Sequence, residues 1–208
     1  MANLNRIYSY YLKLYHYTAH MKKLIILSGI LLSAVAGFGQ AIDGYTSKTR
    51  IYIVRHTEKY TGKDAGRDPL LIATGMQRAG DLMRFLQDKK IKHIYVTPYK
   101  RTGMTADSMR IQLGIDTVHY KADTLCDDLV KKITEKNDLG SAILIIGHSN
   151  TLPKIIRRLG VLDYPQADIP DNEHDNIFLV RIKKKKLIAS HYKYGQSSAI
   201  SPASPMKN

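Results

Sequence analysis

The chain has 208 residues, of which 44% are hydrophobic and 24% are charged, so it is neither intrinsically disordered nor fibrous and can form one globular domain with a sizeable core. Its 32 basic residues outnumber 18 acidic ones and give a formal net charge of +14, which suits an anionic substrate, an anionic membrane surface or nucleic acid alike. Cys126 is the only cysteine, which excludes an intramolecular disulfide and a cysteine-based metal site.

The first forty residues differ in pattern from the rest of the chain. Lys22 and Lys23 precede an apolar run at 24–36, and small residues follow it. This order is typical of a secretory signal peptide, and the run is shorter than the roughly 20 residues that cross a bilayer. We therefore expect residues 1–40 to be a signal peptide with an upstream extension, translation to begin at Met21, and the mature protein to be periplasmic or secreted without a stable membrane anchor.

Beyond this leader, residues 41–195 are predicted to form one domain in which strands and helices alternate. Runs of β-branched and aromatic residues predict the strands, and apolar residues at helical spacing predict the helices. The predicted strands are 50–54, 91–96, 117–120, 142–146, 177–182 and 187–194. The predicted helices are 74–89, 101–113, 124–137 and 151–159. Residues 196–208 are rich in serine, proline and alanine and are predicted to be a flexible tail.

Polar residues and glycines mark the ends of the predicted helices. Thr74 is the expected N-cap of the first helix, and Asp123 or Thr124 that of the third. Gly114 is expected to end the second helix, and Gly140 to break the chain after the third. The alternation predicts a three-layer α/β/α sandwich with a mostly parallel mixed sheet and at least one antiparallel edge strand near the end of the chain.

Chemically active side chains gather directly after three of the predicted strands. The segments are 54–58 (Val-Arg-His-Thr-Glu), 97–101 (Thr-Pro-Tyr-Lys-Arg) and 147–150 (Gly-His-Ser-Asn). In sheets of this kind, ligands bind at the carboxyl ends of the strands. We therefore expect two histidines and two arginines to meet at one rim of the sheet.

The residues concerned are His56, His148, Arg55 and Arg101, and together they suit phosphoryl transfer. A neutral imidazole is a nucleophile at physiological pH, and guanidinium groups match phosphoryl oxygens in bidentate geometry. A second imidazole, when protonated, adds a donor where charge accumulates in the transition state. A histidine at a strand end is, taken alone, more often a structural residue than a nucleophile. The combination of three such segments in one order is what indicates a site.

These segments resemble the motifs of the histidine phosphatase superfamily. The segment 54–58 is similar to the family's Arg-His-Gly motif, with Thr57 in place of the glycine. Asp68-Pro69-Leu70 with Thr74-Gly75 is similar to its "D-x-L-T-x-x-G" segment, and 97–106 to its "S-P-x-x-R-x-x-x-T-A" segment. Gly147-His148-Ser149 is similar to the segment that carries its second histidine.

The resemblance implies a phosphoglycerate mutase-like fold, in its branch 1, and a phosphatase that works through a phosphohistidine. It assigns His56 as nucleophile, Arg55 and Arg101 as phosphate ligands, and His148 as a phosphate contact. It implies neither a metal nor another cofactor. The remaining histidines, His174 among them, lack metal-ligand spacing and are expected to be structural or surface residues. The stretch 173–176 also resembles one in exported bacterial members of the family, which makes it either a possible substrate contact or a strand lead-in.

The chain also departs from the family pattern. Thr57 and Asn150 are candidate substrate contacts, while Ser149 after the second histidine disfavours the acid phosphatase and phytase branch. The carboxylate that protonates the leaving group has no clear counterpart. Asp123 and Glu173 are the candidates, with Asp127 and Asp128 as further possibilities, although such a carboxylate is more often a helix cap or a solvated group than the acid.

The expected function is the hydrolysis of a phosphomonoester or a phosphoramidate. Without a good proton donor, substrates with easy leaving groups, such as a phosphohistidine protein, become more plausible than alkyl phosphates. The leader makes exported relatives that remove phosphate from cell-envelope sugars, which are small phosphorylated substrates, a comparable model. A catalytically weak phosphate-binding protein of the same fold is the alternative. No nucleic-acid partner is expected, because no motif combines basic and aromatic residues for its recognition.

Overall fold

The computed structural model describes residues 45–183 and 186–198. The predicted signal peptide at 1–40, and the predicted tail from 199 onward, lie outside the described residues. Within the described ranges, none of the helices has both the length and the apolar character that crossing a membrane requires.

Each strand and helix predicted from the sequence has its counterpart in the described domain. The strands are β1 (Arg50–Arg55), β2 (Ile91–Val96), β3 (Thr117–His119), β4 (Ala142–Gly147), β5 (Asn176–Lys183) and β6 (Lys186–Lys193). The helices are α2 (Ala73–Leu86), α3 (Lys100–Leu113), α4 (Asp127–Glu135) and α5 (Leu152–Arg158), with a short 3-10 helix, η1 (Gln87–Lys89), after α2.

The strands form one mixed sheet in the order β3-β2-β4-β1-β5-β6. Strands β3, β2, β4 and β1 are parallel, whereas β5 is antiparallel to both of its neighbours. The edge strand β6 therefore pairs antiparallel with β5, as expected, but β5 is the strand whose direction opposes the other described strands. The mostly parallel sheet is confirmed.

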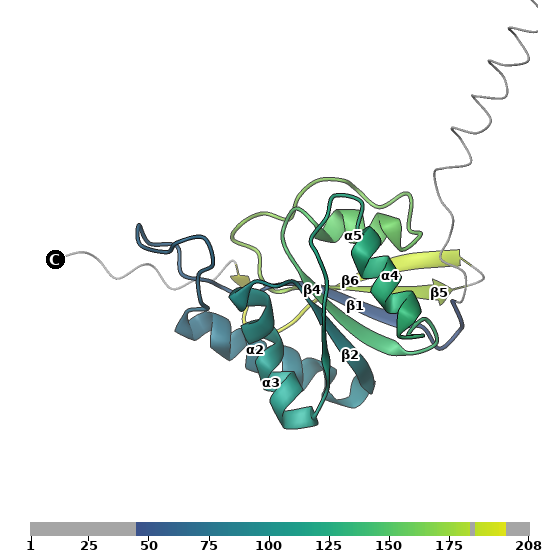
Figure 1. Ribbon diagram of the computed structural model, residues 1–208, viewed down its shortest axis with the longest axis horizontal. Coiled ribbons are helices and arrows are strands. Elements are labelled where there is room, and N and C mark those ends of the chain that lie inside the picture. Colours follow the sequence, from purple (N-terminus) through teal and green to yellow (C-terminus); the bar gives the residue numbers. More distant parts are fainter. Residues whose placement is uncertain (1–44, 184–185, 199–208) are drawn as a thin grey trace, which may run out of the picture. The chain divides into compact units, whose positions relative to one another are not determined.

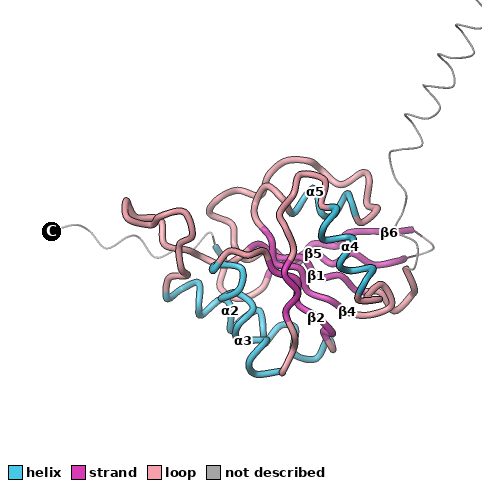
Figure 2. Tube along the Cα trace, in the orientation of Figure 1, coloured by secondary structure: helices cyan, strands magenta, loops and turns pink. Residues whose placement is uncertain are grey.

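Helices cover both faces of this sheet, which confirms the three layers. Figures 1 and 2 show α2 and α3 together on one face and α4 and α5 on the other. Neighbouring residues of β1 pack into opposite layers: Ile53 belongs to a core cluster with Leu129 and Ile155, and Val54 to a second cluster with Leu82. Alternation along the central strands thus builds two cores from one sheet.

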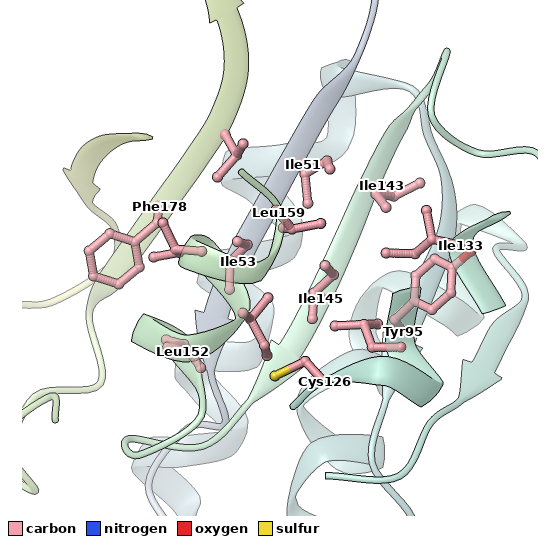
Figure 3. Close-up of a cluster of buried hydrophobic side chains, with 14 of the residues drawn as sticks. Ile51, Ile53, Tyr95, Cys126, Ile133, Ile143, Ile145, Leu152, Leu159 and Phe178 are labelled. Atoms are coloured by element: carbon pink, nitrogen blue, oxygen red, sulfur yellow. The ribbon is translucent and has the colours of Figure 1, made fainter. Parts of the chain in front are cut away.

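The core between the sheet and helices α4 and α5 is lined by branched aliphatic side chains (Figure 3). It includes Ile51, Ile145 and Leu152, each fully buried. Cys126 lies at the edge of this cluster, where burial raises the pKa of its thiol to about 11. A thiol with that pKa is not a nucleophile at neutral pH, so the single cysteine is a packing residue.

The beginning of α2 differs from the prediction. The helix starts at Ala73 after Ile72, with no side-chain cap, and Thr74 lies within its first turn instead of capping it. The N–H of Ile72 donates to the carbonyl of Glu58 at 3.1 Å. A tertiary hydrogen bond to the loop after β1 therefore fixes this helix entry, in place of the local cap that the sequence suggested.

The other helix ends follow the sequence more closely. Helix α4 starts at Asp127, later than expected, but the carboxylate of Asp123 accepts the N–H groups of Asp127 and Asp128 at 3.0 and 3.2 Å. Asp123 therefore satisfies the first N–H groups of α4 as a cap would, although the residue at the N-cap position is Cys126. Gly114 ends α3 with φ of 63°, the left-handed conformation that favours glycine.

Candidate active site

The carboxyl ends of β1, β2 and β4 lie side by side in the sheet. The register pairs Arg55 with Gly147 and Val96 with Ile146. One residue beyond β1, the N–H of His56 donates to the carbonyl of Gly147 at 3.0 Å. Because the three strands are parallel and adjacent, the three segments predicted to form a rim begin at the same edge.

The four residues predicted to carry the chemistry meet there. The ring centroids of His56 and His148 are 5.4 Å apart, and the two residues are 3% and 8% exposed. Arg55 and Arg101 are close enough to act electrostatically on both rings, and each lowers their pKa values. Two cations and two imidazoles thus share one nearly buried site.

The ring of His56 is held in one tautomer. Its Nδ1 lies 2.8 Å from the carbonyl oxygen of Thr57, which can only accept a hydrogen bond, so Nδ1 carries the proton and Nε2 the lone pair. Burial, with smaller contributions from His148 and Arg55, lowers the pKa of His56 to about 2. The imidazole is therefore neutral and nucleophilic at every pH at which proteins normally work.

His148 is also neutral and also held by an uncharged partner. Its Nε2 lies 3.0 Å from Oγ1 of Thr97, which in turn lies 3.0 Å from Oγ1 of Thr102. Burial, followed by the charges of Arg101 and Arg55, lowers the pKa of His148 to about 4. The Thr97 hydroxyl can donate to Nε2, which puts the ring proton on Nδ1, or accept from Nε2, which puts the lone pair on Nδ1; in both cases it fixes the orientation of the ring.

Arg101 combines support on one side with an unused donor. Its guanidinium lies 4.2 Å from the ring centroid of Tyr99, and its Nη1 lies 3.7 Å from a carboxylate oxygen of Asp68. Tyr99 also meets His148 edge-on, with 5.3 Å between the ring centroids. The Nε of Arg101 is buried and has no hydrogen-bond partner in the described residues.

Arg55 is held by a segment far away in the sequence, residues 169–175. Its Nη1 donates to the carbonyl of Pro170 at 3.0 Å and to that of Glu173 at 3.4 Å. Its Nη2 pairs with the exposed carboxylate of Asp171 at 3.1 Å. The Nε of Arg55, like that of Arg101, is buried without a partner in the part of the chain that the structure describes. The Nε–H groups of Arg55 and Arg101 are thus two buried cationic donors that could bind an acceptor.

The tentative substrate contacts lie in different surroundings. Thr57 is completely buried against α3, where its hydroxyl lies 3.3 Å from that of Thr105, so it is not placed to touch a substrate. The extra side chain that replaces the family's glycine therefore packs inward. Asn150 is exposed at the end of the 147–150 segment.

Neither candidate proton donor has its carboxylate on the cluster of imidazoles and guanidiniums. Burial alone would raise the pKa of Asp123, but the hydrogen bonds from Asp127 and Asp128 that cap α4 lower it. The carboxylate of Glu173 accepts from Asn176 at 2.7 Å and pairs with Lys193 at 3.3 Å. Only the main-chain carbonyl of Glu173 reaches the site, through Arg55.

Sequence reasoning gave His174 no more than a possible substrate contact, as part of the stretch 173–176, and did not place it beside the nucleophile. His174, expected to be structural or on the surface, is 8% exposed, and its ring centroid lies 5.9 Å from that of His56. Burial and then the charge of Arg55 lower its pKa. A histidine three residues before a predicted strand gave no sign of this position, because β5 brings its neighbourhood back beside β1 only in three dimensions.

The donor set does not suggest a metal. The described residues contain no group of three or more histidine, cysteine and acidic side chains arranged to hold an ion. The two guanidiniums attract an anion and repel a cation, and the carboxylates of Asp68 and Asp171 each pair with one of them. The arrangement is suited to binding an anion such as a phosphoryl group.

Comparison with known proteins agrees with this architecture. Residues 51–125 match the histidine phosphatase superfamily, branch 1. No curated protein matches the sequence. Among solved structures, YhfR of Bacillus stearothermophilus has a TM-score of 0.51 at 16% identity, with 68% of this chain and 95% of that chain covered.

Two further structures share the fold at similar distance. The alpha-ribazole phosphatase of Shigella flexneri has a TM-score of 0.50 at 15% identity, over 71% of this chain and 96% of that chain. A proposed phosphohistidine phosphatase SixA from Nakamurella multipartitia has a TM-score of 0.50 at 15% identity, over 72% of this chain and 96% of that chain. At these identities the likenesses show the fold alone.

The match over residues 51–125 and the shared fold show that this part of the chain is similar to the histidine phosphatase superfamily, branch 1. Phosphatase chemistry is thus supported at the level of the family. His148 and the 169–175 segment lie outside the matched residues, so their place beside His56 comes from the structure itself.

Proposed function

We propose that the protein is a phosphatase that forms a covalent phosphohistidine on His56. The observation that carries the proposal is the pairing of a neutral imidazole, fixed with its lone pair on Nε2, with two buried guanidinium Nε donors that lack partners. A phosphoryl group offers the acceptor oxygens that these donors need, and its phosphorus is the electrophile that the imidazole needs.

The first step is transfer of the phosphoryl group. The Nε2 lone pair of His56 attacks phosphorus, the Nε2–P bond forms, and the bond from phosphorus to the leaving group breaks. Positive charge develops on the imidazole and is stabilised by the Nδ1–H hydrogen bond to the Thr57 carbonyl. Arg55, Arg101 and His148 hold the phosphoryl oxygens.

The second step regenerates the enzyme. A water molecule attacks the phosphohistidine, the Nε2–P bond breaks, inorganic phosphate leaves, and the lone pair returns to His56. Both steps use only groups that the described residues and water supply.

The surroundings of the site favour substrates with good leaving groups. Neither Asp123 nor Glu173 has its carboxylate on the imidazole and guanidinium cluster, so protonation of a departing alkoxide has no dedicated residue among the candidates. Phosphoramidates, phosphohistidine and aryl phosphates have leaving groups that depart readily, or that solvent can protonate. We therefore propose these classes ahead of simple alkyl phosphates.

The proposal is tested by labelling the purified protein with a radioactive phosphoramidate. We expect label that is labile to acid and stable to alkali in the wild type and in the control His119→Asn, which changes an exposed histidine. We expect none in His56→Asn, with turnover reduced at least ~1000-fold. Label that persists in His56→Asn would overturn the proposed nucleophile. Label that forms but never turns over would instead indicate a phosphate-binding protein.

We propose in addition that the protein is exported. The support is the order of basic, apolar and small residues at 22–41. Mass spectrometry of the protein from its host is expected to find an N-terminus near residue 41 in a fraction outside the cytoplasm. A mature protein that begins at Met1 or Met21 would contradict export by this leader.

A further inference from the structure

The peptide that joins His56 to Thr57 is held from both sides. Its carbonyl oxygen, on His56, accepts a hydrogen bond from Nδ1 of His174 at 2.9 Å. Its N–H, on Thr57, donates to Oγ1 of Thr105 at 3.1 Å. His174 comes from the segment before β5 and Thr105 from α3, so two distant elements grip one peptide of the nucleophile's own backbone.

The orientation of this peptide sets the direction of the His56 ring. The acceptor for Nδ1 of His56 is the carbonyl of Thr57, the next one along the chain. A rotation of the 56–57 peptide would move both the Cα that carries the imidazole and the carbonyl that orients it. The hydrogen bonds that this peptide makes with His174 and Thr105 therefore fix the direction of the Nε2 lone pair through the backbone.

His174 is itself fixed in place. Its N–H donates to Oγ of Ser198 at 3.0 Å, and the neighbouring Asp175 carboxylate accepts from the N–H of Ser198 at 3.1 Å and pairs with Lys193 at 2.8 Å. The ring is nearly buried and tilted by 49° against that of His56. A side chain anchored in this way can hold a backbone carbonyl in one position.

The chemistry at position 174 requires a donor. The carbonyl of His56 only accepts hydrogen bonds, so Nδ1 of His174 must carry the proton. An apolar side chain of similar size would fill the space but leave the carbonyl without this partner. The loss of such a buried hydrogen bond is costly and loosens the group it held.

We propose that His174 is a positioning residue of the reaction, which braces the 56–57 peptide together with Thr105 and so aims the nucleophilic Nε2 of His56. This inference rests on the proposed function of His56. It adds a third histidine, from outside the matched family region, to a site that the sequence motifs describe with two.

The test compares substitutions that differ in where they place a donor. In His174→Asn, the amide nitrogen can occupy the position of Nδ1, so kcat is expected to stay within about threefold of the wild type. His174→Leu removes the donor, and His174→Gln carries it one carbon too far. Both are expected to lower kcat by roughly 10- to 100-fold with little change in KM, because a misaimed nucleophile slows chemistry more than binding.

A spectroscopic readout separates this role from a merely structural one. In 15N-labelled protein, His56 is expected to show a single tautomer with its proton on Nδ1 in the wild type and in His174→Asn. A mixture of tautomers is expected in His174→Leu and His174→Gln. This measurement does not depend on turnover, so it distinguishes failure of the brace from failure of the proposed phosphatase activity.

Thr105 provides the second arm of the test. Thr105→Val removes the acceptor for the Thr57 N–H, and the double variant with His174→Gln is expected to lose far less than the product of the two single losses, because both act on one peptide. Multiplicative losses would contradict a shared brace. Full kcat and an unchanged His56 tautomer in His174→Gln, with only a lower Tm, would overturn the proposal.

Discussion

At the scale of single residues, each imidazole of the site has one nitrogen committed to an uncharged partner. A main-chain carbonyl holds Nδ1 of His56 and a hydroxyl holds Nε2 of His148. A carboxylate in either position would favour the imidazolium and raise the pKa of the ring. Uncharged partners fix the orientation of the rings and leave them neutral, which a nucleophile requires.

The hydroxyl of Thr97 gives the first prediction. Thr97→Val keeps the shape of the side chain but removes the hydroxyl next to Nε2 of His148. We expect kcat to fall by roughly tenfold, because His148 loses the hydroxyl that orients its ring. Steady-state kinetics with an aryl phosphate would check this, with Thr97→Ser as the control that retains the hydroxyl. Equal rates in the two variants would contradict the role.

The second prediction concerns the guanidinium of Arg101. Arg101→Lys keeps the charge but loses the planar group that lies over Tyr99 and the Nε donor that awaits an oxygen. We expect phosphoenzyme formation to slow by roughly 10- to 100-fold, since bidentate binding is lost. Rapid-quench labelling measures this rate. Arg84→Lys, at an exposed ion pair with Asp81, should leave it unchanged. A similar loss in both variants would rule out a specific role for the guanidinium.

The sequence identified the residues that sit directly after strands, but not those that reach the site from elsewhere. His56 and His148 were predictable because each follows an apolar strand in a parallel sheet. His174 and Asp171 were not, since their position depends on how the 169–175 segment crosses Arg55, and no local pattern encodes that path. Their signal would be a contact between distant parts of the chain.

At the scale of elements, α2 packs unusually close to the loop that carries the nucleophile. A Cβ at Gly75 would lie 2.1 Å from the carbonyl oxygen of Glu58, an approach that only glycine permits. In the same loop, the carboxylate of Glu58 pairs with the nearly buried Arg78 of α2 at 2.7 Å. The Thr74-Gly75 motif thus owes its glycine to packing against the active-site loop.

Gly75→Ala is therefore expected to destabilise the domain by roughly 1–3 kcal/mol, because the loop after β1 must move away from α2. The matched control is Gly103→Ala in α3, where a Cβ would meet nothing within 4 Å. The control should be stabilised by about 0.5–1 kcal/mol through helix propensity. Urea unfolding of both variants measures the difference, and equal stability would show that the close approach at Gly75 relaxes without cost.

Element boundaries were harder to predict than elements. Asp123, expected at the N-cap of the third helix, lies three residues before the observed N-cap, Cys126, yet its carboxylate accepts the first N–H groups of α4. Thr74 was expected to cap α2, yet Ile72 begins the helix through its bond to Glu58. Propensity describes local choices well, and a tertiary hydrogen bond overrides them.

At the scale of the whole molecule, several histidines are buried in the neutral form. Burial lowers the pKa of His56 to about 2 and that of His148 to about 4, whereas the unfolded chain protonates both near pH 6.5. Between those values the unfolded state binds more protons, so the free energy of unfolding falls as the pH falls below about 6.5. The stabilisation is fully present above that pH.

Each of these two histidines is expected to remove about 2 kcal/mol of stability between pH 7.5 and pH 5.0. Urea unfolding at the two pH values would measure the loss, and His148→Asn should lose about 2 kcal/mol less than the wild type. If His148→Asn loses as much free energy of unfolding as the wild type between these pH values, the pKa of His148 is not lowered by burial as proposed.

The central place of β1 in the sheet has a consequence for folding kinetics. Its two neighbours are β4 and β5, so Ile51 is paired with Ile143 on one side and Val180 on the other. Both pairings close very long loops, which makes them slow steps in folding. We expect activity to return in the last kinetic phase of refolding, after most of the helical circular dichroism signal. The reason is that the segment that holds Arg55 directly precedes β5 and reaches the site only when β5 pairs with β1.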